Sequence, residues 1–145
     1  MRLSEHLDLS EVIRSESAKR NGISNMPSEE HIANFKLLAE HIFEPVRAYF
    51  RVPIHISSGY RSIELNAKIG GSKTSQHCEG CAADFNVKGM SPDAVVRAIV
   101  TADIPYDQVI LEFDSWVHIS IPTVKGSTPR KQALVIDNKG KRNFN

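Results

Sequence analysis

Apolar side chains recur every three or four residues between positions 28 and 50, and this spacing predicts the longest helix of the chain. Pro27 and Ser28 mark its start. Pro45 lies inside the pattern, and a proline there removes a backbone donor and crowds the preceding turn, so we expect a bend or an interruption. The helix is expected to be the main support of the core through one apolar face: Ile32, Phe35, Leu38, Ile42, Val46 and Phe50.

Shorter helices are predicted from capping residues. Asp8 followed by Glu11 resembles a capping box, and Ser91 followed by Pro92 supplies a cap and a first turn. Glycines end two further segments, because glycine readily adopts the left-handed conformation that closes a helix. One predicted short helix begins at residue 8, and the others span residues 17–21, 63–69 and 91–102.

Alternation of apolar and polar positions predicts the strands. In one of them Ala82, Asp84 and Asn86 share a face opposite Ala83, Phe85 and Val87. Helices come first and strands dominate later, which favours an α+β fold with N-terminal helices packed on a small antiparallel sheet. The predicted strands are residues 54–57, 82–87, 108–113, 116–121 and 133–136, with a hairpin turn at 114–115.

The length of 145 residues fits one domain, residues 1–145, and the hydrophobic and charged shares of 41% and 24% are ordinary for a globular protein. A formal charge of +1 offers no large field for nucleic acid, so no nucleic-acid partner is expected. The only basic cluster lies in residues 125–142, and we expect a loosely ordered tail from about residue 123. We expect a monomer.

The N-terminal residues carry charges where a signal peptide has its apolar stretch, and no run approaches the roughly twenty apolar residues that cross a bilayer. We therefore expect synthesis in the cytoplasm without a signal peptide, and no membrane insertion. If the protein acts outside the inner membrane, another agent must carry it there or release it.

Two segments contain the residue types that bind a catalytic metal. Residues 75–84 read S-x-H-x-x-G-x-A-x-D, and residues 116–118 read W-x-H. His77, Asp84 and His118 supply the three nitrogen or oxygen ligands of a catalytic zinc site, which keeps one position open. Imidazole and carboxylate make zinc the default ion.

These motifs, in their order along the chain, resemble the M15 family of zinc D-alanyl-D-alanine carboxypeptidases, in particular its short phage and bacterial members. The resemblance implies the hedgehog/DD-peptidase fold, zinc held by His77, Asp84 and His118, and a peptide of the bacterial cell wall as substrate. It covers most of the chain up to Pro122 through these segments: SEHLDLSEVIRSESAKRNGISN, SSGYRS with ELN, IGGSKTSQH, AADF and WVHIS.

The resemblance also implies roles for further residues. Arg61 of SGYR matches an arginine that polarises the substrate, and Ser75 matches a residue that can bind the carboxylate end of the substrate. In part of the family the general base lies three residues before the last histidine, where this chain has Ser115. Glu112, six residues before His118 as in hedgehog, is our choice of base, with Asp114 in reserve. We expect Trp116 to form part of the pocket wall.

Cys78 and Cys81 form a CxxC pair between two of the proposed ligands. A redox CxxC pair opens a helix after a strand, and a structural zinc site needs a second Cys or His pair of matching spacing. Neither condition is met here, so we interpret both cysteines as small side chains packed beside the site. Oxidation of Cys81, or competition by its thiol for the metal, is a minor alternative.

Two hypotheses follow. The first is a zinc metallopeptidase that cuts the stem or cross-link of peptidoglycan as a carboxypeptidase or an endopeptidase, for example a phage lysis or virion-associated enzyme, or a cytoplasmic enzyme acting on precursors. The second is a cell-wall binding module that keeps zinc while catalysis is weak or lost. Ser115 at the usual acid position motivates the second hypothesis. Which peptide bond is cut stays open, because pocket loops decide it.

Overall fold

The N-terminal segment of the computed structural model, which describes residues 1–145, is a small hairpin followed by two short helices. The predicted capping box is confirmed, since Asp8 and Glu11 exchange hydrogen bonds with each other's backbone. Gly22 ends the second helix in the left-handed conformation. The elements are β1 (Arg2–Ser4), β2 (Leu7–Asp8), α1 (Leu9–Ile13) and α2 (Glu16–Asn21).

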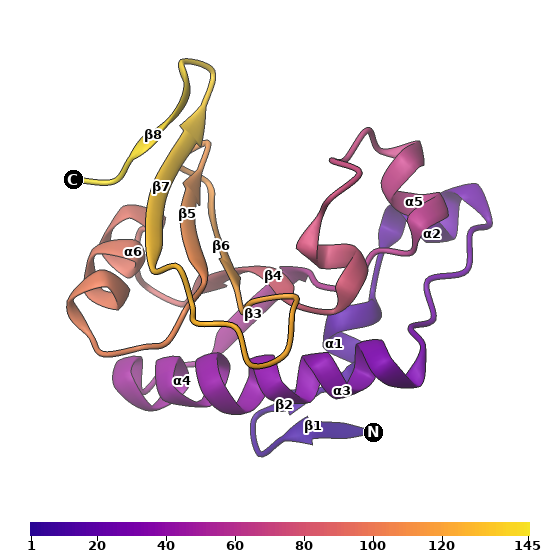
Figure 1. Ribbon diagram of the computed structural model, residues 1–145, viewed down its shortest axis with the longest axis horizontal. Coiled ribbons are helices and arrows are strands. Elements are labelled where there is room, and N and C mark those ends of the chain that lie inside the picture. Colours follow the sequence, from indigo (N-terminus) through magenta and orange to yellow (C-terminus); the bar gives the residue numbers. More distant parts are fainter.

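A long helical rod runs along the base of the molecule in Figure 1. It consists of α3 (Glu29–Leu38), a π-helical turn (Ala39–Phe43) and α4 (Glu44–Phe50). The N–H of Glu44 donates to the carbonyl of Ala39, five residues earlier. The predicted interruption near Pro45 is therefore confirmed, and it takes the form of a π turn directly before the proline.

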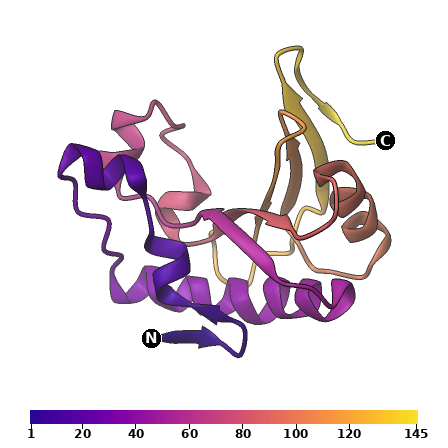
Figure 2. The same ribbon diagram turned by 180° about the vertical axis from the view of Figure 1, so that it is seen from behind.

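A six-stranded sheet stands on this rod, in the order β3-β4-β6-β5-β7-β8 (Figures 1 and 2). All neighbouring strands are antiparallel except β5 and β7, which are parallel. The α+β prediction is confirmed. The strands are β3 (Ile54–Ser58), β4 (Ala82–Val87), β5 (Gln108–Glu112), β6 (Trp116–Ser120), β7 (Gln132–Asp137) and β8 (Gly140–Asn143).

The C-terminal tail contributes the last two of these strands. β7 pairs with β5 over five residue pairs, and β8 returns antiparallel along β7. The loose order expected from residue 123 therefore does not extend to residues 132–143. Backbone hydrogen bonds hold these residues in strands. The sequence does not indicate this pairing, because the many charged side chains of the tail are typical of a solvated segment.

The hairpin between β5 and β6 differs slightly from the prediction. Its loop spans residues 113–115 and begins one residue earlier, because Phe113 and Asp114 both adopt a positive φ, 53° and 51°. Apolar Phe113 reads as a strand residue, but its ring leaves the strand to pack on Trp116, with 5.7 Å between the ring centroids.

One face of the sheet forms the core against the helices. Phe85 meets Phe43 of the rod edge to face, with ring centroids 5.5 Å apart, and α6 (Pro92–Thr101) packs on β5 and β6. The predicted division of the β4 side chains between two faces is confirmed, because Ala83, Phe85 and Val87 are buried in this core. No helix is long and apolar enough to span a membrane. The largest fully buried core side chains include Phe35, Leu38, Ile42, Val95, Val96, Ile99 and Ile119.

Two segments leave the sheet on the side opposite β8. After β3 the chain forms α5 (Ile63–Lys68), and a 3₁₀ turn (Gln76–Glu79) then leads back to β4. Gly80 ends that turn at φ 75°, and a Cβ there would lie 2.5 Å from the carbonyl oxygen of His31. Glycine is therefore required where the turn packs on α3.

Candidate active site

The strand register assembles the site on the sheet face that points away from the core. Asp84 of β4 lies directly opposite His118 of β6, and Glu112 of β5 lies opposite Trp116. Residues opposite each other in a pair, and residues two apart along a strand, point to the same side. Asp84, His118 and Glu112 therefore project from one face although 34 positions separate the first two.

The 3₁₀ turn brings His77 to the same point. Oδ1 of Asp84 lies 3.3 Å from Nε2 of His77 and 3.0 Å from Nδ1 of His118. The three potential ligand atoms all lie within 4.8 Å of one another. His77 and His118 are buried, with exposed fractions of 2% and 8%, and Asp84 is half-buried.

A backbone hydrogen bond fixes how His77 presents its ring. Nδ1 of His77 lies 2.7 Å from the carbonyl oxygen of Gly59. A carbonyl oxygen can only accept, so Nδ1 carries the proton, and in the neutral ring Nε2 presents its lone pair to Asp84. This arrangement, in which the second ring nitrogen is held by a backbone acceptor, is typical of histidines that bind a metal.

The resulting electrostatics fit a cation. A lone pair and a carboxylate oxygen that face each other at 3.3 Å repel unless the ring is protonated or a positive ion lies between them. Burial raises the pKa of Asp84, but hydrogen bonding to His118, and to His77 when that ring is protonated, outweighs burial and lowers that pKa well below its usual range. The aspartate is thus ionised, and the group could hold a metal ion.

Glu112 lies at the edge of this group. Its Oε1 is 3.7 Å from Nδ1 of His118. Burial, together with the nearby charge of Asp84, raises the pKa of Glu112, while the positive charges of His118 and Arg61 act in the opposite direction. The structure therefore brings a second carboxylate, with increased basicity, next to the His77–Asp84–His118 group.

The residues expected to contact substrate lie around the same point. The Arg61 guanidinium donates from Nη2 to Oγ of Ser75 at 3.2 Å, and Ser75 Oγ also accepts from the backbone N–H of His77. The Nε of Arg61 and the indole Nε1 of Trp116 are buried and have no hydrogen-bond partner. Unpaired buried donors are costly, so each of these N–H groups would gain from a hydrogen-bond partner.

These side chains line one cavity of about 500 Å³. It contains every site residue predicted from the sequence except Asp114. The sequence did not predict the remaining wall, because it comes from loops, from non-motif positions of β5 and from the tail, whose pairing no motif marks. The lining residues not predicted are Ser72, Thr74, Gln76, Gln108, Ile110, Arg130 and Lys141.

Asp114 is exposed in the β5–β6 loop and does not line the cavity. Ser115 is also exposed, and its hydroxyl donates to the carbonyl of Phe113. The structure therefore places Glu112, and not its reserve Asp114, beside the histidines. Neither loop residue contacts the group.

The two cysteines are free and lie beside the site without joining the His77–Asp84–His118 group. Cys81 is buried, which raises the pKa of its thiol to about 12, and Cys78 is half-buried with a raised pKa for the same reason. Both thiols stay protonated near neutral pH, which agrees with a packing role.

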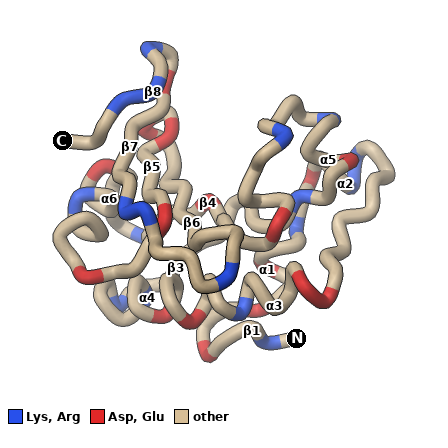
Figure 3. Tube along the Cα trace, in the orientation of Figure 1, with Lys and Arg blue, Asp and Glu red and all other residues tan.

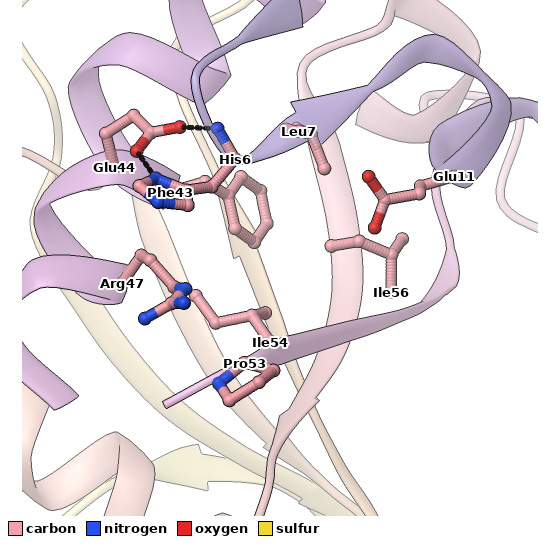
Figure 4. Close-up of a pocket in the computed structure, with 9 residues that line it drawn as sticks. All are labelled: His6, Leu7, Glu11, Phe43, Glu44, Arg47, Pro53, Ile54 and Ile56. Carbon is pink, nitrogen blue, oxygen red and sulfur yellow. Dashed lines mark hydrogen bonds and ion pairs between the residues drawn. The ribbon is translucent and has the colours of Figure 1, made fainter. Parts of the chain in front are cut away.

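A second, smaller cavity of about 210 Å³ lies under the N-terminal hairpin (Figure 4). Glu5, His6 and Glu44 also come close enough there to hold an ion, but Glu5 and His6 are exposed. The Glu44 carboxylate already accepts from the Ser4 hydroxyl, the His6 backbone and His6 Nδ1. Its evident role is to fasten the hairpin to the start of α4.

Most of the chain matches the sequence model of a known protein family. Residues 5–120, more than half of the 145-residue chain, match the model of the family described as Peptidase M15. No curated protein matches the chain. The matched range ends at the last residue of β6, so it includes all the residues of the His77–Asp84–His118 group and excludes β7 and β8.

Proposed function

Because the chain belongs to the Peptidase M15 family, we propose that it is a zinc-dependent peptidase that hydrolyses peptide bonds of bacterial peptidoglycan. One observation carries the proposal. The ligand atoms of His77, Asp84 and His118 converge at the floor of a cavity, with the Glu112 carboxylate 3.7 Å from His118. Family membership implies a metallopeptidase, and the wall peptide as substrate is our inference from the sequence resemblance.

The metal would be held by Nε2 of His77, Oδ1 of Asp84 and Nδ1 of His118. Two neutral imidazoles and one carboxylate leave a charge of −1, to which Glu112 adds another, so a divalent cation neutralises the group. When bound, zinc acts as a Lewis acid and makes water a better nucleophile near neutral pH.

Glu112 is the proposed general base. Its raised pKa strengthens its affinity for a proton, and its position at the edge of the group lets it take a proton from the attacking water and pass it to the leaving amine. Asp84 has the opposite environment, with a lowered pKa, and so stays an ionised ligand. Two carboxylates in one site thus have different roles.

Arg61 is the proposed electrophilic group. Its Nη2 donates to Ser75, and its buried Nε–H has no partner. The side chain lines the cavity, where the positive guanidinium can stabilise the negative charge that develops on the scissile carbonyl oxygen, or bind a substrate carboxylate. Ser75, held by the His77 backbone, orients the guanidinium.

The alternative, a zinc-containing wall-binding module, is less well supported. It was motivated by Ser115, but this residue lies outside the cavity, whereas Glu112 occupies a position suited to a base. A peptidase needs a carboxylate base beside the metal group, whereas a binding module does not require one.

The test is digestion of purified peptidoglycan by the zinc-loaded protein, with new amines counted. We expect Glu112→Gln to reduce the rate by a factor of about 10² to 10⁴, the usual contribution of a general base. Asp114→Asn, two residues away and outside the cavity, is the matched control and should retain the wild-type rate. Equal rates for the wild type and Glu112→Gln would remove Glu112 from the mechanism. No release by the wild type would favour the binding module.

A further inference from the structure

The wall of the cavity farthest from Arg61 is built by the C-terminal tail. Arg130 precedes β7, and Lys141 lies on β8, yet both line the same cavity as the His77–Asp84–His118 group. These residues lie beyond the range matched by the family, which ends at residue 120. The tail strands thus add a surface to the cleft that the family match does not account for.

The strand register places Lys141 in line with the proposed base. Glu112 of β5 lies opposite Ile136 of β7, and Ile136 lies opposite Lys141 of β8. The three residues form one row across the sheet and point to the same face. Two strand spacings separate Glu112 from Lys141, roughly 10 Å, which is the length of about three residues of extended peptide.

Arg130 and Lys141, the two tail cations, differ in whether an acidic partner neutralises their charge. The Arg130 guanidinium donates to both oxygens of the buried Asp107 carboxylate, so its charge is largely offset. Lys141 has no ion pair and no hydrogen bond from its ammonium group. Figure 3 shows further basic positions along β8, and one of these, Arg142, is paired with Asp137.

The cleft therefore has cations at both ends. Arg61 follows β3 at one edge of the sheet, and Lys141 lies on β8 at the opposite edge, with β4 and β6 and their His and Asp side chains between them. Gln108, also in the cavity wall, adds a neutral amide on the Lys141 side. A peptide that spans the cleft would pass over the proposed metal group and reach both cations.

We propose that Lys141 forms a subsite for a carboxylate of the peptide substrate, about three residues from the bond that is cut. The proposal rests on the proposed peptidase function and deepens it, because it names an acidic residue as a specificity determinant. The cleft is thus suited to a peptide that extends from the reacting bond toward β8 and carries a carboxylate about three residues away.

The experiment measures binding separately from turnover. Two wall peptides are compared that are identical except that the glutamyl residue has a free α-carboxylate in one and a carboxamide in the other. Trp116 is the only tryptophan of the chain and lines the cavity, so its fluorescence reports binding. The zinc-loaded Glu112→Gln protein gives the dissociation constants, and the active protein gives kcat/KM for the same peptides.

We expect the carboxylate peptide to bind about three- to fivefold more tightly than the amide, as for a partly exposed ion pair. Lys141→Gln should abolish this preference, and Lys141→Glu should reverse it. Lys139→Gln is the matched control, because Lys139 lies in the same hairpin but does not line the cavity, and it should leave the preference unchanged.

Each outcome separates the two proposals. Equal binding of the two peptides by the parent protein, or a preference that survives in Lys141→Gln, overturns the subsite even if both peptides are hydrolysed. A preference that depends on Lys141 without hydrolysis by the active protein supports the subsite and refutes the peptidase function. If Glu112→Gln does not fold, the ratio of kcat/KM values for the two peptides gives the same comparison.

Discussion

A single backbone carbonyl holds the ring of His77, and the residue that supplies it has no side chain. A Cβ at Gly59 would lie 2.4 Å from the carbonyl oxygen of Val12, so any larger residue must displace one of the two backbones. The carbonyl that accepts from His77 Nδ1 would move with it. Gly59 is therefore an indirect determinant of the proposed metal site.

Substitution Gly59→Ala should weaken zinc binding by about 10- to 100-fold, the usual effect of disturbing a group that orients a ligand. A competition titration with a chromophoric chelator measures this. Gly89→Ala is the control, because Gly89 has a positive φ but lies in open space away from the site, so it should lose stability without losing zinc affinity. An unchanged zinc affinity in Gly59→Ala would show that the carbonyl does not orient His77.

Asp107 is a second residue whose role only the structure reveals. Its buried carboxylate accepts from Arg130 and from the Gln76 amide, and so joins the tail to the turn that contains His77. Burial raises the pKa of Asp107, but these hydrogen bonds outweigh burial and lower it. A lowered folded-state pKa contributes stability above the unfolded pKa, and this contribution is lost as the pH falls through the folded value.

Asp107→Asn should therefore lower the free energy of unfolding by about 1.5 kcal/mol at pH 7. The difference from the wild type should shrink below about pH 4, where the carboxyl first binds a proton in the unfolded chain and, at lower pH, in the folded protein. Urea denaturation at several pH values measures it. Asp103→Asn, at an exposed aspartate four residues earlier, should change little at any pH. A difference that is constant from pH 7 to pH 3 would contradict this role.

At the residue scale, the motifs were sufficient for His77, Asp84 and His118, because their types and order are specific. Glu112 could be proposed as the base, but the sequence could not decide between it and Asp114, since the choice depends on where strand β5 ends and the loop begins. Gly59, Asp107 and Lys141 could not be found, because each acts through a contact between segments distant in sequence, and no local pattern encodes such a contact.

At the scale of elements, the N-terminal hairpin depends on one side chain of the helical rod. Glu44, which follows the π turn, accepts three hydrogen bonds from Ser4 and His6. Burial raises the pKa of Glu44, but these bonds outweigh burial and lower it. The carboxylate is therefore ionised when the hairpin is docked.

Removal of this contact by Glu44→Ala should destabilise the protein by about 2 kcal/mol. It should also speed amide exchange at Leu9, whose N–H bonds the carbonyl of Met1 at the end of the hairpin. Glu40→Ala, at an exposed position in the π turn, is the control and should leave both measurements unchanged. Exchange at Leu9 that stays as slow as in the wild type would show that the hairpin docks without Glu44.

Most elements could be predicted because each has a local signal. The caps at Asp8 and Ser91 and the alternation in β4 are of this kind, and all are confirmed. The parallel pairing of β7 with β5 could not be predicted, since a strand sequence does not specify its partner. The hairpin loop shifted by one residue because Phe113 is apolar but packs on Trp116 outside the strand.

At the scale of the whole molecule, the fold is a two-sided cleft over a sheet. The apolar face of the sheet rests on the rod and α6, while the polar face carries the His77–Asp84–His118 group between α5 on one side and the tail strands on the other (Figure 1). The hydrophobic core thus fixes the register of β4, β5 and β6, and the register fixes the site. A one-residue slip would turn Asp84, Glu112 and His118 toward the core.

The proposed function depends on one zinc ion held by His77, Asp84 and His118 at the floor of this cleft. Crystals of the zinc-loaded protein, measured on both sides of the zinc absorption edge, test it most directly. We expect one anomalous peak per chain, in contact with His77 Nε2, Asp84 Oδ1 and His118 Nδ1, and its loss in Asp84→Ala. A zinc peak bound only elsewhere, or none at all in the wild type, would contradict it.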